Sequence, residues 1–177
     1  KKQPIRPDWN YDVSELTKAK YLARMLFIHA ALDVPVFWNE TWNNQHIYRD
    51  VGLLRNTYSA EPDSPMSPQP AYYVMRTCST VLDGVKPIKI DLAVLPSVPN
   101  MQIHAFENKT GQKLIAMWCA IREDDNFAGK QVSLTLPNIS NTEVTGIDTL
   151  NGFEQKINIE HDGKDLIITN IVIRDYP

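Results

Sequence analysis

The sequence predicts an α+β protein in which a helix–strand–helix unit is followed by an antiparallel β-sandwich of about seven or eight strands. Apolar residues recur at helical spacing over residues 13–32 and 71–83, with a short apolar run between them at 34–38. From Ile88 onward the apolar period becomes two, and turn residues separate the segments every 8–12 residues, which is typical of a sandwich. We therefore divide the chain into residues 1–86 and residues 87–177.

Composition excludes several classes of function. The 177 residues are 43% hydrophobic and 22% charged, as in an ordinary globular protein, and the net charge is −3. There is no basic excess of the kind that nucleic-acid binding requires, and no apolar run approaches the ~20 residues that span a bilayer. The chain starts at Lys1 without Met or a signal-like apolar stretch, which indicates processing or excision from a longer protein.

The first helix is predicted over residues 13–32. Asp12 is a suitable N-cap, and Glu15 completes a capping-box pattern three residues later. Asp33 and Pro35 end the helix. The small residues along its apolar face favour close packing against a sheet.

The apolar run at 34–38 is predicted to be a strand buried on both faces, as in a parallel sheet covered by helices. One such strand has no sheet to pair with, so the unit is interpreted as the end of a larger α/β domain. Residues 43–70 have the composition of a long loop. Pro70 suits the first position of the second helix, at 71–83, and Gly84 ends it.

The sandwich strands are predicted from the alternating pattern and the turns between the segments. They are residues 88–94, 101–107, 113–121, 131–136, 143–150, 153–160 and 165–173. Asn151 and Gly152 predict a tight two-residue hairpin turn, because both residue types accept positive φ angles.

The candidate binding site follows the 34–38 strand and consists of Trp38, Asn39, Glu40 and Trp42. In barrels of alternating strands and helices, the residues after each strand line the mouth of the active site. Indole rings match the C–H face of a sugar, and amide and carboxylate groups bind hydroxyls. The alternative is that both tryptophans pack beneath the long loop. Glu40 lacks an obvious second acid for glycoside hydrolysis, since Asp50 lies in the loop, so no catalytic residue is assigned.

Other chemistry is not indicated. The four histidines, His29, His46, His104 and His161, lack metal-ligand spacing, so neither a metal nor another cofactor is expected. Residues 123–126 form an acidic stretch without the ligand spacing of a calcium loop, and a solvated turn is predicted there. Cys78 and Cys119 are interpreted as small buried side chains, and a disulfide between them stays open.

Several motifs resemble the last βα units of (β/α)₈ glycoside hydrolases. They are Ala19-Lys20-Tyr21-Leu22-Ala23-Arg24, Val36-Phe37-Trp38, Gly52-Leu53-Leu54 and Pro70-Ala71-Tyr72-Tyr73. The closest resemblance is to the two-glutamate clan of β-xylosidase-like and α-L-iduronidase-like enzymes. The second half is similar to the sandwich that follows such barrels, in the segments 103–106, 113–118 and 146–152 and in the final Asp175-Tyr176-Pro177.

This resemblance implies that residues 1–86 are the C-terminal remnant of a barrel and residues 87–177 its accessory sandwich. The family's two catalytic glutamates would precede Lys1, so the chain alone is expected to be inactive. Trp38 matches a substrate-contact position, whereas Asn39, Glu40 and Trp42 follow it only by proximity. The parent would hydrolyse O-glycosyl bonds of a poly- or oligosaccharide, and a secreted or periplasmic location is then expected.

Two hypotheses from other classes stay open. A non-catalytic carbohydrate-binding module would present a row of exposed aromatic side chains on the sandwich. A structural domain would bury exposed barrel remnants against a second copy or against the missing barrel portion. Neither nucleic acid nor a membrane is an expected partner.

Overall fold

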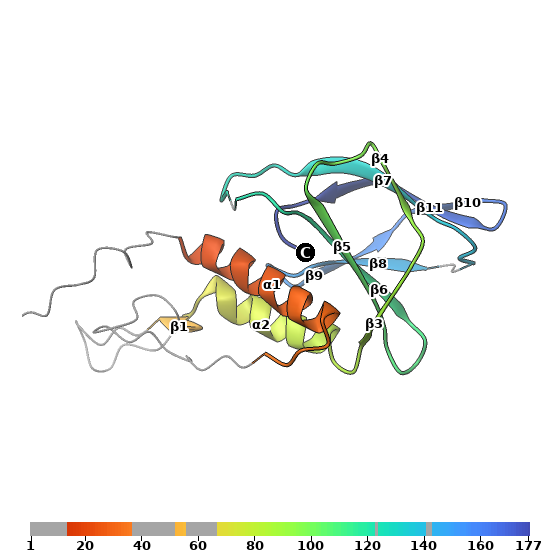
Figure 1. Cartoon of the computed structure of the whole chain (residues 1–177). Coiled ribbons are helices and arrows are strands. Elements are labelled where there is room, and N and C mark those ends of the chain that lie inside the picture. Colours follow the sequence, from red (N-terminus) through yellow and green to blue (C-terminus); the bar gives the residue numbers. More distant parts are fainter. Residues whose placement is uncertain (1–13, 37–51, 56–66, 123, 141–142) are drawn as a thin grey trace, which may run out of the picture.

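The computed structural model describes residues 14–36, 52–55, 67–122, 124–140 and 143–177. Two helices lie side by side at one end of a body of β-strands (Figure 1). The elements are α1 (Glu15–Ala31), β1 (Leu54–Arg55), β2 (Ser67–Pro68), α2 (Pro70–Val81), β3 (Lys86–Ile88), β4 (Ala93–Leu95), β5 (Met101–Glu107), β6 (Lys113–Cys119), β7 (Lys130–Leu136), β8 (Val144–Asp148), β9 (Phe153–Ile157), β10 (Ile159–Asp162) and β11 (Asp165–Ile173). Every strand pair among the described residues is antiparallel, so the α+β prediction is confirmed.

Both helices form where the sequence predicts them. The N-cap of α1 is Ser14, whose hydroxyl accepts a hydrogen bond from the Thr17 amide at 2.9 Å, and it lies directly before the first helical residue. The predicted cap Asp12 lies outside the described residues. Helix α2 begins at Pro70 as expected, and Gly84 follows its end with φ of +66°.

The two helices run in the same direction along the sandwich (Figure 1). At their N-terminal ends, the Lys18 ammonium donates to the side-chain oxygen of Gln69, the N-cap of α2. Beyond their C-terminal ends, Lys86 pairs with Asp33 at 3.3 Å. The two contacts show that the N-terminal ends of the helices lie together and that their C-terminal ends do so too.

The expected buried strand at 34–38 is wrong in its described part. Val34, Pro35 and Val36 have no strand partner, and the Val34 side chain is 47% exposed. A strand is stable only when its backbone groups find a neighbouring strand, and none of the described strands pairs with residues 34–36. Residues 37 and 38 lie outside the described part of the chain.

The β-body contains two main sheets, ordered β10-β11-β7-β4 and β3-β5-β6, and the separate hairpin β8-β9. Strands β5 and β11 match their predicted limits. The predicted strand 88–94 is divided into β3 and β4, which pair with β5 and β7 in different sheets. The predicted strand 153–160 is likewise divided into β9 and β10, which pair with β8 and β11. Each predicted strand is broken because its chain crosses from one sheet to another.

The turn between β8 and β9 also differs from its prediction. Gly152 has φ of +70°, but Asn151 does not adopt a positive φ, and the loop has four residues, 149–152. The Asp148 carboxylate accepts hydrogen bonds from the Leu150 and Asn151 amides at 2.9 and 3.2 Å. This side-chain cap stabilises a longer turn than the Asn-Gly pair alone predicts.

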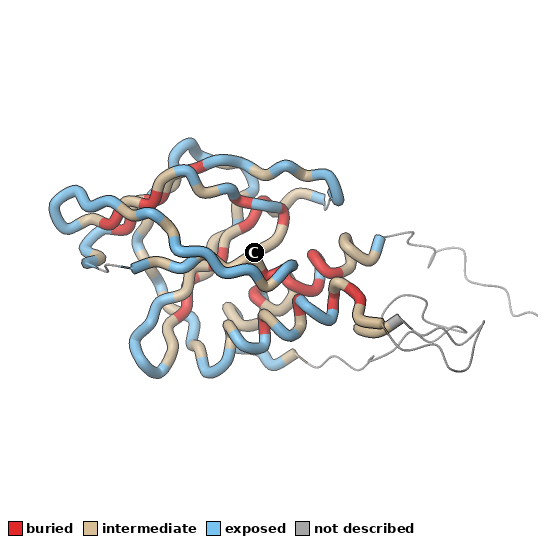
Figure 2. The backbone as a smooth tube through the Cα atoms, turned by 180° about the vertical axis from the view of Figure 1, so that it is seen from behind, coloured by how far each residue is buried: buried red, intermediate tan, exposed pale blue. Residues whose placement is uncertain are grey.

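The sheet β3-β5-β6 forms a middle layer. Phe106 and Trp118 on one face belong to the cluster that includes Phe27 of α1 and Val74 of α2. Cys119 on the other face belongs to a second cluster, together with residues of β7 and β11. Figure 2 shows buried segments at both the helices and the middle of the β-body. A strand covered on both faces explains the continuous apolar run of β6.

Candidate functional site

The four predicted site residues, Trp38, Asn39, Glu40 and Trp42, lie outside the described residues. The structure nevertheless describes both ends of the segment that carries them. Val36 follows the C-terminal end of α1, whereas the carbonyl of Gly52 accepts a hydrogen bond from Lys18 in the first turn of α1 at 3.1 Å. The segment therefore ends beside the N-termini of both helices.

The N-terminal end of the helix pair is polar and closely packed. Gln69 is fully buried; its side-chain oxygen accepts from Lys18, and its backbone amide donates to the Leu53 carbonyl at 2.9 Å. The Gln69 side-chain nitrogen is buried and has no hydrogen-bond partner. Leaving a buried amide donor unpaired costs about 1–3 kcal/mol. A polar partner for the Gln69 side-chain nitrogen would therefore stabilise this end of the helix pair.

A buried ion pair joins α1 to the C-terminal segment. The Lys20 ammonium lies 3.0 Å from an Asp175 oxygen, and the two side chains are 3% and 0% exposed. Lys20 also donates to the Asp124 carbonyl at 2.5 Å, and the Asp124 amide donates to the same Asp175 oxygen at 3.0 Å. The other Asp175 oxygen is buried without a partner. We call Lys20, Arg24 and Asp175 the helix–tail junction.

Arg24, one turn after Lys20, completes this junction. Its guanidinium donates to three backbone carbonyls, those of Asp175 at 2.7 Å, Ile121 at 2.8 Å and Cys119 at 2.9 Å. The planar fork of an arginine suits several acceptors at once. The junction therefore fastens α1 to the end of β6 and to the last residues of the chain.

Tyr176 and Asp148 extend the polar region toward β8. The Tyr176 hydroxyl donates to the Asp148 carboxylate at 3.3 Å, and burial, with the nearby Asp148 charge, raises the pKa of Tyr176 to about 12. A phenol with that pKa remains protonated at neutral pH. It acts here as a hydrogen-bond donor and not as a base.

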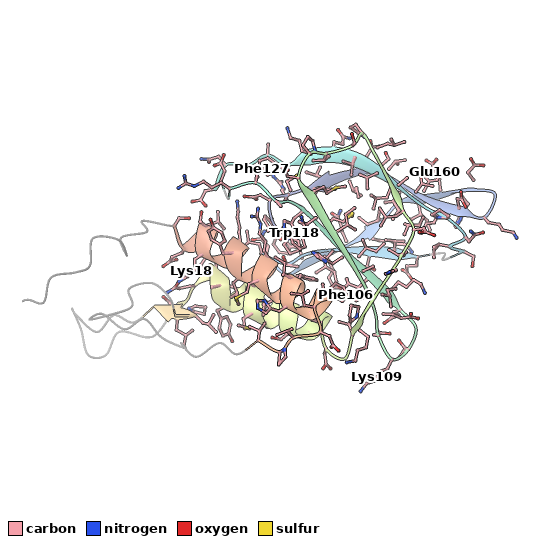
Figure 3. All side chains as sticks on the ribbon, in the orientation of Figure 1. Lys18, Phe106, Lys109, Trp118, Phe127 and Glu160 are labelled. Carbon is pink, nitrogen blue, oxygen red and sulfur yellow. The ribbon has the colours of Figure 1, made fainter. Side chains whose placement is uncertain are left out.

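His104, on β5, lies against the apolar cluster beside the helices. Its ring stacks on Trp118 with centroids 5.1 Å apart, and its Nε2 is buried without a hydrogen-bond partner. Burial lowers the pKa of His104 below its ordinary value. In Figure 3 Trp118 and Phe106 lie between the helices and the strands, which places this histidine in a packing environment.

Within the described part of the chain, the remaining polar groups show no catalytic constellation. Among the described residues, no group of three or more histidine, cysteine or acidic side chains is placed to hold a metal ion. Asp124 accepts from the Asn126 amide at 2.9 Å, as expected for a turn, and hydrogen bonds from Ser14 and Thr17 lower the pKa of Asp125. Both cysteines are free and buried, in different clusters, and burial raises the pKa of Cys78 to about 12. Unreactive, buried thiols match the sequence interpretation.

Sequence reasoning missed the helix–tail junction. Lys20 and Arg24 lie four residues apart, so they share one face of α1, the face on which Phe27 is also buried. Two cations on an apolar helical face were the available signal. Their acidic partner, Asp175, is 155 positions from Lys20 and could not be identified from local pattern.

No protein-family model matches this chain, and no curated protein matches its sequence. Among the described residues, neither helix has the length and apolar character needed to cross a membrane.

Proposed function

We propose that this chain is the C-terminal part of a glycoside hydrolase that cleaves O-glycosyl bonds of a poly- or oligosaccharide. In this proposal α1 and α2 are the last helices of a (β/α)₈ barrel, and β3 to β11 form its accessory sandwich. The catalytic carboxylates would belong to the part of the parent protein before Lys1.

The parallel helix pair is the observation that carries the proposal. Consecutive, neighbouring helices that run in the same direction are the arrangement of βα units, in which a strand returns the chain between them. In this proposal residues 37–51 would return the chain, and they include the predicted sugar-contact residues. The far end of this segment lies beside the N-termini of the helices, through the contact between Gly52 and Lys18. In a βα barrel this is also the side of the active site, because each strand ends where the next helix begins.

The helix–tail junction supports the assignment of the sandwich as a brace. An accessory domain that only hangs from a linker needs no buried ion pair with the helices. Lys20 and Arg24 instead hold the C-terminal segment directly against α1. Leu150, in the β8–β9 turn, adds an apolar contact to the same cluster as α2. Both helices therefore contribute to the contact with the sandwich, and the charged contacts come from α1.

A carbohydrate-binding module without catalysis is less well supported. It would need several exposed aromatic side chains in a row. Trp118 and Phe106 are 1% and 0% exposed, and Phe153 is the one strongly exposed aromatic residue in the described sandwich, at 71%. One exposed ring gives a weak platform for a sugar chain.

The proposal is tested with two proteins from the same reading frame. One is the 177-residue chain, and the other includes the residues encoded upstream of Lys1. We expect the longer protein to hydrolyse aryl glycosides and the 177-residue chain to show no turnover. Within the longer protein, Trp38→Ala should lower kcat/KM more than Trp38→Phe, because phenylalanine keeps an aromatic face for the sugar. Turnover by the short chain, or a longer protein without glycosidase activity, would overturn the proposal.

A further inference from the structure

Strands β9 and β11 form a fork in the β-body. The chain from Phe153 to Asp162 first pairs with β8 and then, as β10, with the first half of β11, where Ile159 lies opposite Ile168. In the second half of β11, from Ile171 to Ile173, the described structure shows pairing only with β7. Figure 1 shows β10 beside β11, while β8 and β9 lie apart from it. We call the space between β9 and the second half of β11 the strand fork.

A bulge in β11 marks the point where the fork opens. The register with β7 shifts between Ile168 and Ile171, and Asn170 within this stretch has φ of +59°. The Asn170 side chain accepts a hydrogen bond from Gln131 at 3.0 Å, which holds the bulge in place. At the other end the fork is closed, because the Cys119 amide donates to the Arg174 carbonyl at 2.8 Å.

The fork contains a large cavity, with a volume of about 870 Å³. Its walls are formed by consecutive residues along four strands, namely 113–117 of β6, 144–148 of β8, 153–157 of β9 and 168–173 of β11. Because side chains alternate along a strand, a lining of consecutive residues includes the backbone as well as one row of side chains. The cavity therefore presents strand edges and not only apolar groups.

Part of the inner face of the β8–β9 hairpin is not covered by any of the described residues. Val144 and Ile157 point inward, since both pack against the cluster between the sheets. Gln155 and Phe153 follow Ile157 at spacings of two along the same strand, so they share this face. Both are nevertheless exposed, Phe153 to 71%. An inward-facing phenylalanine in contact with water indicates that a layer of the sandwich is missing at this place.

We propose that the strand fork is a binding site for an extended polypeptide segment, which adds a strand between β9 and the second half of β11. The bound segment would continue the ladder of β11 on its unpaired side. Residues on one face of the segment would fill the apolar cavity, and residues on the other would face solvent, so its sequence alternates between apolar and polar side chains without proline.

A strand fits the site better than a small apolar molecule does. An apolar ligand would cover the edges of β9 and of the second half of β11, which have no strand partner among the described residues, without bonding their N–H and C=O groups, at a cost of about 1–3 kcal/mol for each buried group. A peptide backbone supplies both donors and acceptors at the required spacing. The inference concerns the sandwich alone and does not depend on the proposed hydrolase activity.

Two variants of β9 form a matched pair for the test. Gln155→Trp places an indole on the inner face of β9, where Gln155 lines the cavity. Lys156→Trp places the same side chain on the outer face, where Lys156 pairs with exposed Glu143 at 3.3 Å. Both positions are exposed, and circular dichroism and thermal unfolding check that each variant folds.

The probe is a fluorescein-labelled octapeptide of alternating threonine and isoleucine flanked by lysines. The control peptide has the same sequence with alternate backbone nitrogens methylated, which removes the hydrogen bonds of one edge. We expect the wild-type chain and Lys156→Trp to bind the probe by fluorescence anisotropy, and Gln155→Trp and the methylated peptide to bind about tenfold more weakly or less. Hydrogen exchange should show new protection of residues 153–157 and 169–173 in the complex.

Three results would overturn the proposal. The first is equal binding by both variants or by both peptides, and the second is no binding up to about 1 mM peptide. The third is full protection of residues 153–157 and 169–173 in the free chain. Protection that does not depend on protein concentration would mean that β9 pairs with β11 in the free chain. Protection that increases with protein concentration would mean that a second copy of the chain occupies the strand fork.

Discussion

The two hydrophobic clusters of this chain are built differently. The cluster between the helices and β5–β6 holds large rings, with Phe27 and Phe106 at a centroid distance of 6.1 Å, and the helix–tail junction lies at its edge. The cluster between the sheets consists mainly of aliphatic residues and borders the open cavity of the strand fork. The comparison indicates that one interface is fixed by packing and charge together, whereas the other keeps space for an added element.

The largest expected effect comes from breaking the helix–tail junction. Asp175→Ala leaves the Lys20 ammonium buried without its partner, and we expect a loss of about 3–5 kcal/mol in the free energy of unfolding by urea denaturation. The double variant Lys20→Met/Asp175→Ala is the control and should recover most of the loss, because no buried charge remains. A loss below about 1 kcal/mol for Asp175→Ala is the size expected for a solvent-exposed ion pair. It would contradict the burial of the Lys20–Asp175 pair and the claim that charge helps to fix the helix-side interface.

A leucine pair compares the clusters directly. Leu22 and Leu134 are both 2% exposed, the first in the helix-side cluster and the second in the cluster beside the cavity. We expect Leu22→Ala to cost about 4 kcal/mol and Leu134→Ala about 2 kcal/mol, since Leu134 already borders open space and loses fewer contacts. Urea unfolding of the two variants provides the measurement. Equal losses would indicate that the cavity is closed in solution.

Arg24→Lys tests the geometry of the junction separately from its charge. Lysine keeps the positive charge but cannot reach three carbonyls with a planar fork, so we expect a loss of about 1–2 kcal/mol. Arg76→Lys on α2 is the matched control, because the Arg76 guanidinium lies over the Tyr73 ring at 5.3 Å and lysine keeps a cation at this position, so stability should change by less than about 0.5 kcal/mol. Equal effects of the two substitutions would contradict the assigned role of Arg24.

The smallest expected effect is a pH dependence that comes from His104. Burial lowers the pKa of His104 in the folded chain below its ordinary value of 6.5, so the unfolded chain binds more protons near that pH. The contribution to stability is therefore present above pH 6.5 and is lost as the pH falls through this value. His104→Phe should flatten the fall in unfolding free energy between about pH 7.5 and 5. If the unfolding free energies of wild type and His104→Phe change with pH in the same way, burial of His104 does not contribute to the pH dependence of stability.

The sequence predicted the elements of the sandwich better than it predicted the strand after α1. Strands such as β5 and β11 carry their own signal, because alternating apolar residues and flanking turns are local properties. The apolar run at 34–38 carries a similar signal, but a strand also needs a neighbour, and the described residues from Val34 to Val36 have none. The candidate site from Trp38 to Trp42 lies outside the described residues and stays a prediction.

Local pattern by itself determined the two helices, their limits near Pro70 and Gly84, and the alternating strands of the second half. Tertiary structure alone decided which sheet each strand joins, where 88–94 and 153–160 divide, and that Lys20 pairs with Asp175. The physical reason is the distance along the chain over which each interaction acts. Helix caps and side-chain periodicity act over a few residues, whereas pairing and burial depend on residues that are far apart in the chain and meet only when it folds.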